Sequence, residues 1–159
     1  MAVKPRPTWI QKLEKKQEPK IVELDKKQQE KFGGTTMYIS TPMEIYELVK
    51  VLPKGKVTTV NLIREKLAAQ HGTDVTCPLT TGIFLWIVSN AVEKMRAAGK
   101  KVNAPYWRVL KEGGKLNDKY PGGIKEQAAK LEAEGFLAVF NKTGKAASIA
   151  GFENKLFRF

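Results

Sequence analysis

The residues with the types and spacing for chemistry lie between Asn103 and Gly123. Pro105-Tyr106-Trp107-Arg108-Val109 is followed by a polar connector and then by Tyr120-Pro121-Gly122-Gly123. A free phenol has a pKa of about 10 and an indole has no basic nitrogen, so neither aromatic is a nucleophile or a base at neutral pH. We therefore predict no catalytic residue in this stretch.

A cysteine and a histidine offer a second place to look for chemistry. Cys77 is the only cysteine and His71 the only histidine, and both fall in the irregular connector of residues 70–78. One interpretation is a thiol activated by an imidazole. The one we favour is a partly buried loop cysteine beside a histidine at a helix end. A single cysteine forms no intrachain disulfide and gives no thiolate metal site, so we expect no metal and no cofactor.

Taken in their order along the chain, the motif segments resemble the DNA-binding domain of the alkylguanine-DNA alkyltransferases, and more closely that of their non-catalytic alkyltransferase-like relatives. The resemblance covers residues 41–135 and includes Leu131-Glu132-Ala133-Glu134-Gly135. The family carries Pro-Cys-His-Arg-Val where this chain has residues 105–109, so its nucleophile and base are both absent. In active members the counterpart of Glu134 holds that histidine. The resemblance thus implies a former active-site pocket without alkyl transfer, made of Pro105, Tyr106, Trp107 and Glu134.

The same resemblance implies a DNA-binding surface. Residues 52–59, Leu-Pro-Lys-Gly-Lys-Val-Thr-Thr, resemble the segment that leads into the family's first DNA-facing helix. The family has a Tyr that pushes against the phosphate of the extruded nucleotide, and this chain has Val60 at that place. The family also has an Arg that fills the gap in the base stack, and this chain has Gly82 there, with Ile83 or Phe84 beside it. These departures weaken the inference of base flipping more than the inference of DNA binding. The implied DNA-binding residues are Thr58, Thr59, Val60, Thr80, Thr81, Gly82, Arg108, Gly122 and Gly123.

Several of these residues have a purely structural alternative. The threonine pairs are expected at helix starts, where hydroxyls and free N–H groups favour phosphate, but they can equally cap the helices. Tyr106 and Trp107 either stack on an extruded base or fill the old alkyl pocket. Arg108 either binds a phosphate or pairs with Glu134.

The elements that position these residues are predicted as mainly α with small β elements, in a winged-helix-like helix-turn-helix with a C-terminal β-hairpin. Thr41 is expected to cap a helix, with Pro42 at its first position and Glu44 completing a capping box. Further helices are expected from Thr58 or Thr59 to Gly72, from Thr80 to about Ala98 with a broad inward stripe that includes Ile83, and over 124–134. A turn at 141–145 joins strands over 136–140 and 146–150.

The chain is expected to divide into three parts. Residues 1–34 are predicted as a basic arm and linker, in which Thr8 caps a short helix starting at Trp9 and residues 23–31 are solvated. Residues 35–135 form the DNA-binding domain. Residues 136–159 form the hairpin and a docked aromatic tail, with Phe152, Leu156, Phe157 and Phe159.

Charge points to the partner. The sequence has 28 Lys and Arg against 16 Asp and Glu, a formal charge of +12, which favours double-stranded DNA through its phosphates. No apolar run approaches the roughly 20 residues of a membrane span, and no apolar amino-terminal segment forms a signal peptide. We expect a cytoplasmic, nucleoid-associated protein without a membrane partner. Damage recognition by nucleotide flipping is a subsidiary hypothesis. The alternative function is a protein-interaction module in which Trp86, Trp107 and the aromatic tail face a partner.

Overall fold

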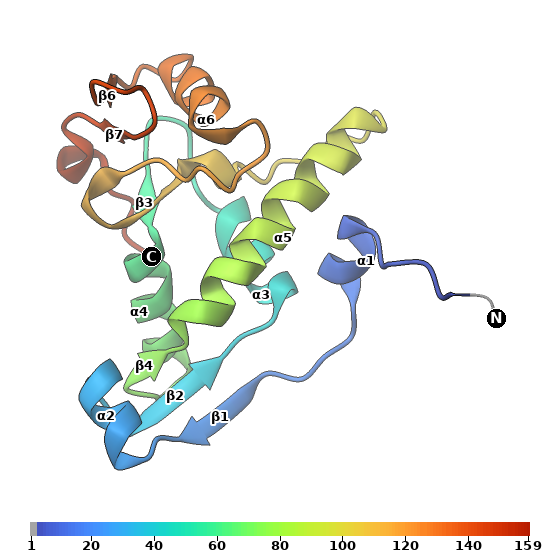
Figure 1. The fold of residues 1–159 in the computed structure, drawn as a ribbon, viewed down its shortest axis with the longest axis vertical. Helices are drawn as coiled ribbons and strands as arrows, with labels where there is room; N and C mark the ends of the chain where they lie inside the picture. The colour runs from blue at the N-terminus through green and yellow to red at the C-terminus, as the bar shows by residue number, and fades with distance from the viewer. Residues whose placement is uncertain (1–2) are drawn as a thin grey trace.

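Six α-helices and small pieces of sheet build the fold (Figure 1), which the computed structural model describes for residues 3–159. The helices are α1 (Trp9–Glu14), α2 (Lys26–Phe32), α3 (Pro42–Lys50), α4 (Val60–His71), α5 (Pro78–Ala97) and α6 (Gly123–Glu132). The strands are β1 (Lys20–Glu23), β2 (Thr36–Ile39), β3 (Thr58–Thr59), β4 (Val75–Thr76), β5 (Val109–Leu110), β6 (Ala138–Phe140) and β7 (Ala147–Ile149), and the 3-10 turns are η1 (Tyr106–Arg108), η2 (Glu112–Gly114) and η3 (Phe152–Lys155). The prediction of a mainly α fold with small β elements and a C-terminal hairpin is confirmed.

Each sheet joins segments that are distant in the sequence or closes a hairpin. β2 pairs antiparallel with β1 and parallel with β4, while β6 and β7 form the antiparallel hairpin. β3 and β5 pair in parallel, with Thr58 opposite Val109 and Thr59 opposite Leu110. This last pairing fixes the start of α4 against the segment that carries Tyr106, Trp107 and Arg108.

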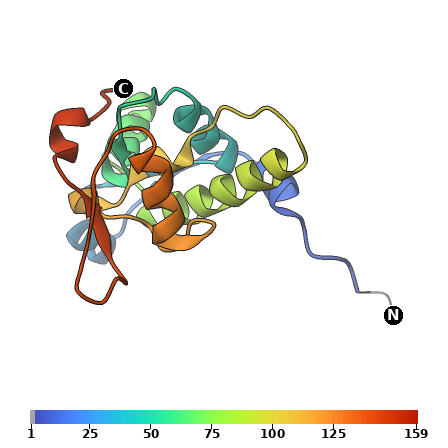
Figure 2. The same cartoon turned by 90° about the horizontal axis from the view of Figure 1, so that it is seen from above.

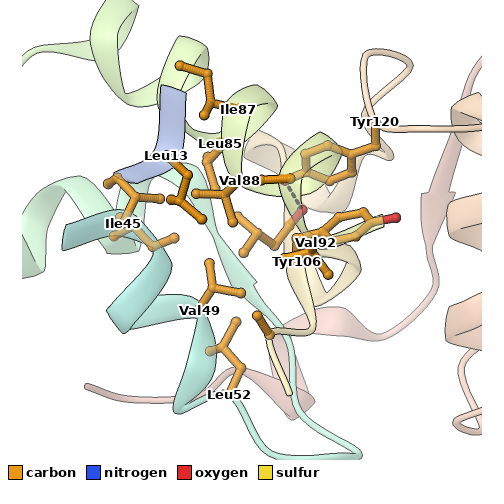
Figure 3. Close-up of a cluster of buried hydrophobic side chains, with 14 of the residues drawn as sticks. Leu13, Ile45, Val49, Leu52, Leu85, Ile87, Val88, Val92, Tyr106 and Tyr120 are labelled. Carbon is orange, nitrogen blue, oxygen red and sulfur yellow. Dashed lines mark hydrogen bonds between the residues drawn. The ribbon is translucent and has the colours of Figure 1, made fainter. Parts of the chain in front are cut away.

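The molecule has two hydrophobic clusters. The larger one packs α3, α4 and α5 around side chains such as Ile45, Val88 and Val92, with Tyr106 and Tyr120 at its edge (Figure 3). The smaller one lies between α6, the β6–β7 hairpin and β5. Trp107 packs against both clusters and joins them.

Helix ends follow local signals in most places. Thr41 caps α3 by accepting from the Glu44 N–H at 3.2 Å, but no capping box forms because the Glu44 carboxylate binds Tyr38 and His71 instead. Thr59 caps α4, and Gly72 ends it in the left-handed region. α5 begins at Pro78, two residues earlier than predicted, since proline suits the first helical position.

The amino-terminal region is more ordered than predicted. Thr8 does cap α1, with Gln11 completing a capping box. The predicted linker, however, contains β1 and α2, and α2 starts with its own capping box between Asp25 and Gln28. Leu13 is buried in the larger cluster, and Figure 2 shows α1 lying against α5 while residues 3–8 extend away. Residue 34 is therefore not a structural boundary.

The carboxyl-terminal tail is bound to the body by backbone pairing. The Val57 N–H donates to the Lys155 carbonyl at 2.9 Å, and the Phe157 N–H donates to the Val57 carbonyl at 2.8 Å. Phe157 and Phe159 pack against the larger cluster, edge to face with one another. Within residues 3–159, no helix has both the length and the apolarity to cross a membrane.

Candidate functional site

The predicted former pocket is built on η1 and the start of β5. The backbone turns after Pro105, where the Arg108 N–H donates to the Pro105 carbonyl at 3.0 Å, and β5 then pairs with β3. Pro105, Tyr106 and Arg108 are buried and Trp107 is half-buried. The structure places Glu134 against Trp107 and Arg108, next to Pro105 and Tyr106 in the chain.

Tyr106 fills the interior of this site. Its side chain is 1% exposed, its hydroxyl donates to Glu93 Oε1 at 2.8 Å, and its ring lies edge-on to Tyr120 at 5.1 Å. Burial, followed by the hydrogen bond to Glu93, raises the pKa of the Tyr106 phenol well above its ordinary value. The uncharged Tyr106 ring occupies the interior of the site, so of the two interpretations the structure favours filling of the pocket over stacking on an extruded base.

Glu134 is occupied by the two residues that follow Tyr106. It accepts from Trp107 Nε1 at 2.7 Å and from Arg108 Nε and Nη2 at 2.7 and 3.1 Å. Arg108 Nη1 also donates to the Leu52 carbonyl at 2.6 Å, and the Arg108 and Glu134 side chains are only 10% and 9% exposed. Arg108 therefore makes its polar contacts inside the protein, and the prediction that it contacts DNA is wrong.

The indole of Trp107 is surrounded by cations. Arg96, Lys130 and Arg108 lie 5.4, 5.3 and 5.8 Å from its ring centroid. Glu93 balances two of them, at 3.4 Å from Arg96 and 3.7 Å from Lys130. The site is thus a network of interacting aromatic rings, two carboxylates and three cations.

The predicted threonine pairs are divided by burial. Thr58 is fully buried, and its hydroxyl has no hydrogen-bond partner among residues 3–159. Thr81 is fully buried too and donates to the Cys77 carbonyl at 2.7 Å, because it lies inside α5 and not before it. Neither hydroxyl can reach a phosphate, so that part of the prediction is wrong.

Thr59, Val60 and Thr80 remain at the ends of α4 and α5 as candidates. Thr59 is buried and accepts from the Leu62 N–H, Val60 is half-buried against the larger cluster, and Thr80 is half-buried with its hydroxyl 3.4 Å from the Cys77 carbonyl. Their positions suit structural roles first. A phosphate contact by any of them stays a prediction.

The predicted glycines have different structural requirements. Gly122 and Gly123 have φ of 80° and 72°, and a side chain on Gly122 would meet the Glu126 Cβ at 2.5 Å, so this turn before α6 requires glycine at that position. Gly82 is exposed on α5, and a Cβ there would meet nothing within 4 Å. Gly82 and Glu93 are separated by about 16 Å along the helix axis, so the start of α5 is a region distinct from the Tyr106 site.

The sequence interpretation placed Trp86 at a partner surface in its alternative function but missed the exposed Leu79 and Ile83 beside it at the start of α5. Leu79, Ile83 and Trp86 are 71%, 42% and 40% exposed, although Ile83 was predicted to face inward. Together with Pro78, Gly82 and Lys119 they line a hollow of about 580 Å³. The spacing of Leu79, Ile83 and Trp86, at i, i+4 and i+7, is the signal that could have revealed a second helix face.

The histidine and the cysteine do not form a catalytic pair. His71 Nε2 lies 2.8 Å from Glu44 Oε2, and its ring stacks on Tyr38 with centroids 3.9 Å apart. Cys77 is the residue before α5. Within the described part of the chain, no group of three or more His, Cys, Asp or Glu side chains is arranged to hold a metal ion.

Comparison with known proteins gives two likenesses, both to solved structures. One is an ATL protein of S. pombe in complex with DNA, at 19% identity and a TM-score of 0.44. The other is Atl1 of S. pombe in complex with damaged DNA containing O6-carboxymethylguanine, at 18% identity and a TM-score of 0.45. Each alignment covers 74% of this chain and 94% of the other. No family model and no curated protein matches the chain, so a function has to follow from the residues of the chain itself.

Proposed function

We propose that this chain is a non-catalytic protein that binds double-stranded DNA through α4 and α5. The observation that carries the proposal is a surplus of cations without carboxylate partners. Of the 28 Lys and Arg side chains, Lys50, Arg96, Arg108 and Lys130 lie within 4.0 Å of a carboxylate oxygen in residues 3–159. Cations that are not neutralised within a protein attract a polyanion, since binding releases the counterions of its phosphates.

Exposed lysines lie ahead of α4 and beside the start of α5, the two helices of the proposed interface. Lys54 and Lys56 flank the turn at Gly55 ahead of β3 and α4. Lys119 is exposed and shares the hollow at the start of α5. A DNA partner would also give the chain its expected cytoplasmic, nucleoid-associated location.

The proposal that the protein is non-catalytic rests on the Tyr106 site. Transfer of an alkyl group needs a nucleophile, and the atoms available here are a phenol held neutral by burial and an indole N–H that already donates to Glu134. We expect no radioactive label to move from methylated DNA to the protein. Stoichiometric label on Tyr106 or Cys77 would contradict this part of the proposal.

The experiment for DNA binding measures the affinity for a labelled duplex across salt concentrations by fluorescence anisotropy. Changing Lys56→Glu and Lys119→Glu should weaken binding for every sequence and lower the log–log salt slope by about 0.9 for each phosphate that the protein no longer neutralises. The matched control is Lys142→Glu, which changes an exposed lysine in the turn between β6 and β7. Equal losses of affinity from all three changes would show that charge alone, without a defined face, attracts the DNA.

The exposed apolar surface on α5 favours a second candidate, the protein-interaction module. Leu79, Ile83 and Trp86 form the kind of contiguous apolar surface that marks partner contacts. This candidate would take over if the folded protein showed no affinity for duplex DNA at low salt.

A further inference from the structure

The hollow at the start of α5 has the form of a binding site for a flat ring. Gly82 lines it together with Leu79, Ile83 and Trp86. Its volume of about 580 Å³ lies within the range of about 300–1,000 Å³ that is typical of small-ligand sites. The Trp86 indole packs edge-to-face with Trp9, with ring centroids 4.7 Å apart, and is the residue of this lining that offers an aromatic ring for stacking.

The absence of a side chain at Gly82 creates this hollow. A Cβ at that position would meet nothing within 4 Å, and the glycine has no positive φ that would exclude other residues. Glycine in a helix interior is less favourable than alanine by roughly 1 kcal/mol. Neither the fold nor helix propensity therefore explains the glycine, whereas close approach of a ligand to the helix backbone does.

The charge around the hollow indicates which ring would bind. The charged residue among its six lining residues is Lys119, and Lys12 Nζ lies 6.0 Å from the centroid of the Trp86 ring. The hollow thus combines an apolar, aromatic lining with the cation of Lys119, and Lys12, which lies 4.5 Å from the Trp9 ring centroid, adds positive charge nearby. A nucleobase with its phosphates has the matching combination of a flat apolar face and negative charge.

We propose that the hollow around Gly82 holds a single unstacked nucleobase of bound DNA, with an adjacent phosphate on Lys119. The inference rests on the proposed DNA binding and names the feature of the DNA that is recognised, an unpaired or weakly stacked base. The Tyr106 site does not serve this purpose, because its interior is filled by the Tyr106 ring and its indole is enclosed by cations.

The test compares a perfect duplex with the same duplex containing one bulged 2-aminopurine. The wild-type protein should bind the bulged duplex on the order of tenfold more tightly, as expected for one base stacked on an aromatic side chain. The fluorescence of 2-aminopurine should fall as it stacks on Trp86, and this drop should be absent in Trp86→Ala.

Filling the hollow separates binding from stability. Gly82→Ala should raise the melting temperature, and Gly82→Leu should bring the ratio of bulged-duplex to perfect-duplex affinity down to about one; because the readout is a ratio, any change common to both duplexes cancels. The matched control is Ala129→Leu, which adds bulk at an exposed position of α6 and should keep the preference.

Two results would overturn the proposal in different ways. If wild-type protein binds both duplexes equally, or if Gly82→Leu keeps the bulge preference, DNA binding stands and the hollow is not a base site. If wild-type protein binds neither duplex at low salt, the proposed function fails and this inference fails with it.

Discussion

Glu134 should be the most sensitive position of the Tyr106 site, and Glu134→Ala is the change that tests it. In the structure its carboxylate accepts three hydrogen bonds, two from Arg108 and one from Trp107. Without it, Arg108 keeps the Leu52 carbonyl as an acceptor, and the buried guanidinium loses its counter-charge. Breaking a buried ion pair in this way costs about 3–5 kcal/mol.

The assay is urea unfolding followed by far-ultraviolet circular dichroism, with a thermal melt alongside. For a chain of this size each kcal/mol corresponds to about 2–4 °C, so the melting temperature should fall by about 10 °C. The matched control is Glu132→Ala, an exposed carboxylate at the end of α6 just before Glu134, which should change the free energy of unfolding by about 0.5 kcal/mol or less. The double change Arg108→Met with Glu134→Leu should cost less than Glu134→Ala, because it removes both charges together.

An equal, small effect of Glu134→Ala and Glu132→Ala would refute the reasoning. It would mean that water reaches the Arg108 guanidinium and that Arg108 and Glu134 do not form a buried ion pair. Arg108 would then be free to contact a phosphate, which the sequence analysis had predicted.

Three further predictions concern the core, the first helix and a helix cap. Burial raises the pKa of Tyr106, so the stability that its phenol provides is present below the unfolded pKa of about 10 and is lost as the pH rises above that value. Tyr106→Phe should therefore be less stable near neutral pH. In urea titrations, its free energy of unfolding should also fall less steeply at alkaline pH than that of the wild-type protein. Leu13→Ala should cost about 2–4 kcal/mol, whereas Lys15→Ala on the exposed surface should cost almost nothing, and equal values would show that α1 is not part of the core. Thr59→Ala should cost about 1 kcal/mol in a thermal melt, because the Leu62 N–H loses its acceptor, and an unchanged melt would contradict this cap.

Local sequence signals located most of the elements. Thr41 and Thr59 accept hydrogen bonds as caps, Gly72 ends α4 with φ of 68°, and residues 141–145 turn the hairpin with the Asn141 side chain accepting from the turn. These features depend on residues within a few positions of one another, which is why they can be read from the sequence. The capping box of Asp25 and Gln28 was equally local, but the surrounding charge led to the prediction of a linker.

The assignment of charged and polar side chains to partners depended on distant residues. Arg108 could have bound a phosphate or Glu134, and the choice is made by α6, whose end brings Glu134 to 2.7 Å. Thr81 and Thr58 were read as surface hydroxyls, yet both are buried because α5 starts earlier and β3 pairs with β5. Burial of this kind follows from packing between elements and has no local signal.

The sequence by itself determined the excess of positive charge, the absence of a thiol at position 106 and of an imidazole at position 107, and the positions of most helices. The tertiary structure decided which apolar residues stay uncovered. The apolar positions of α5 extend over more of its circumference than the core requires, and α1, α3 and α4 cover part of that surface while leaving Leu79, Ile83 and Trp86 exposed. Periodicity gives the width of an apolar face, but only the docking of other elements determines how much of that face is buried.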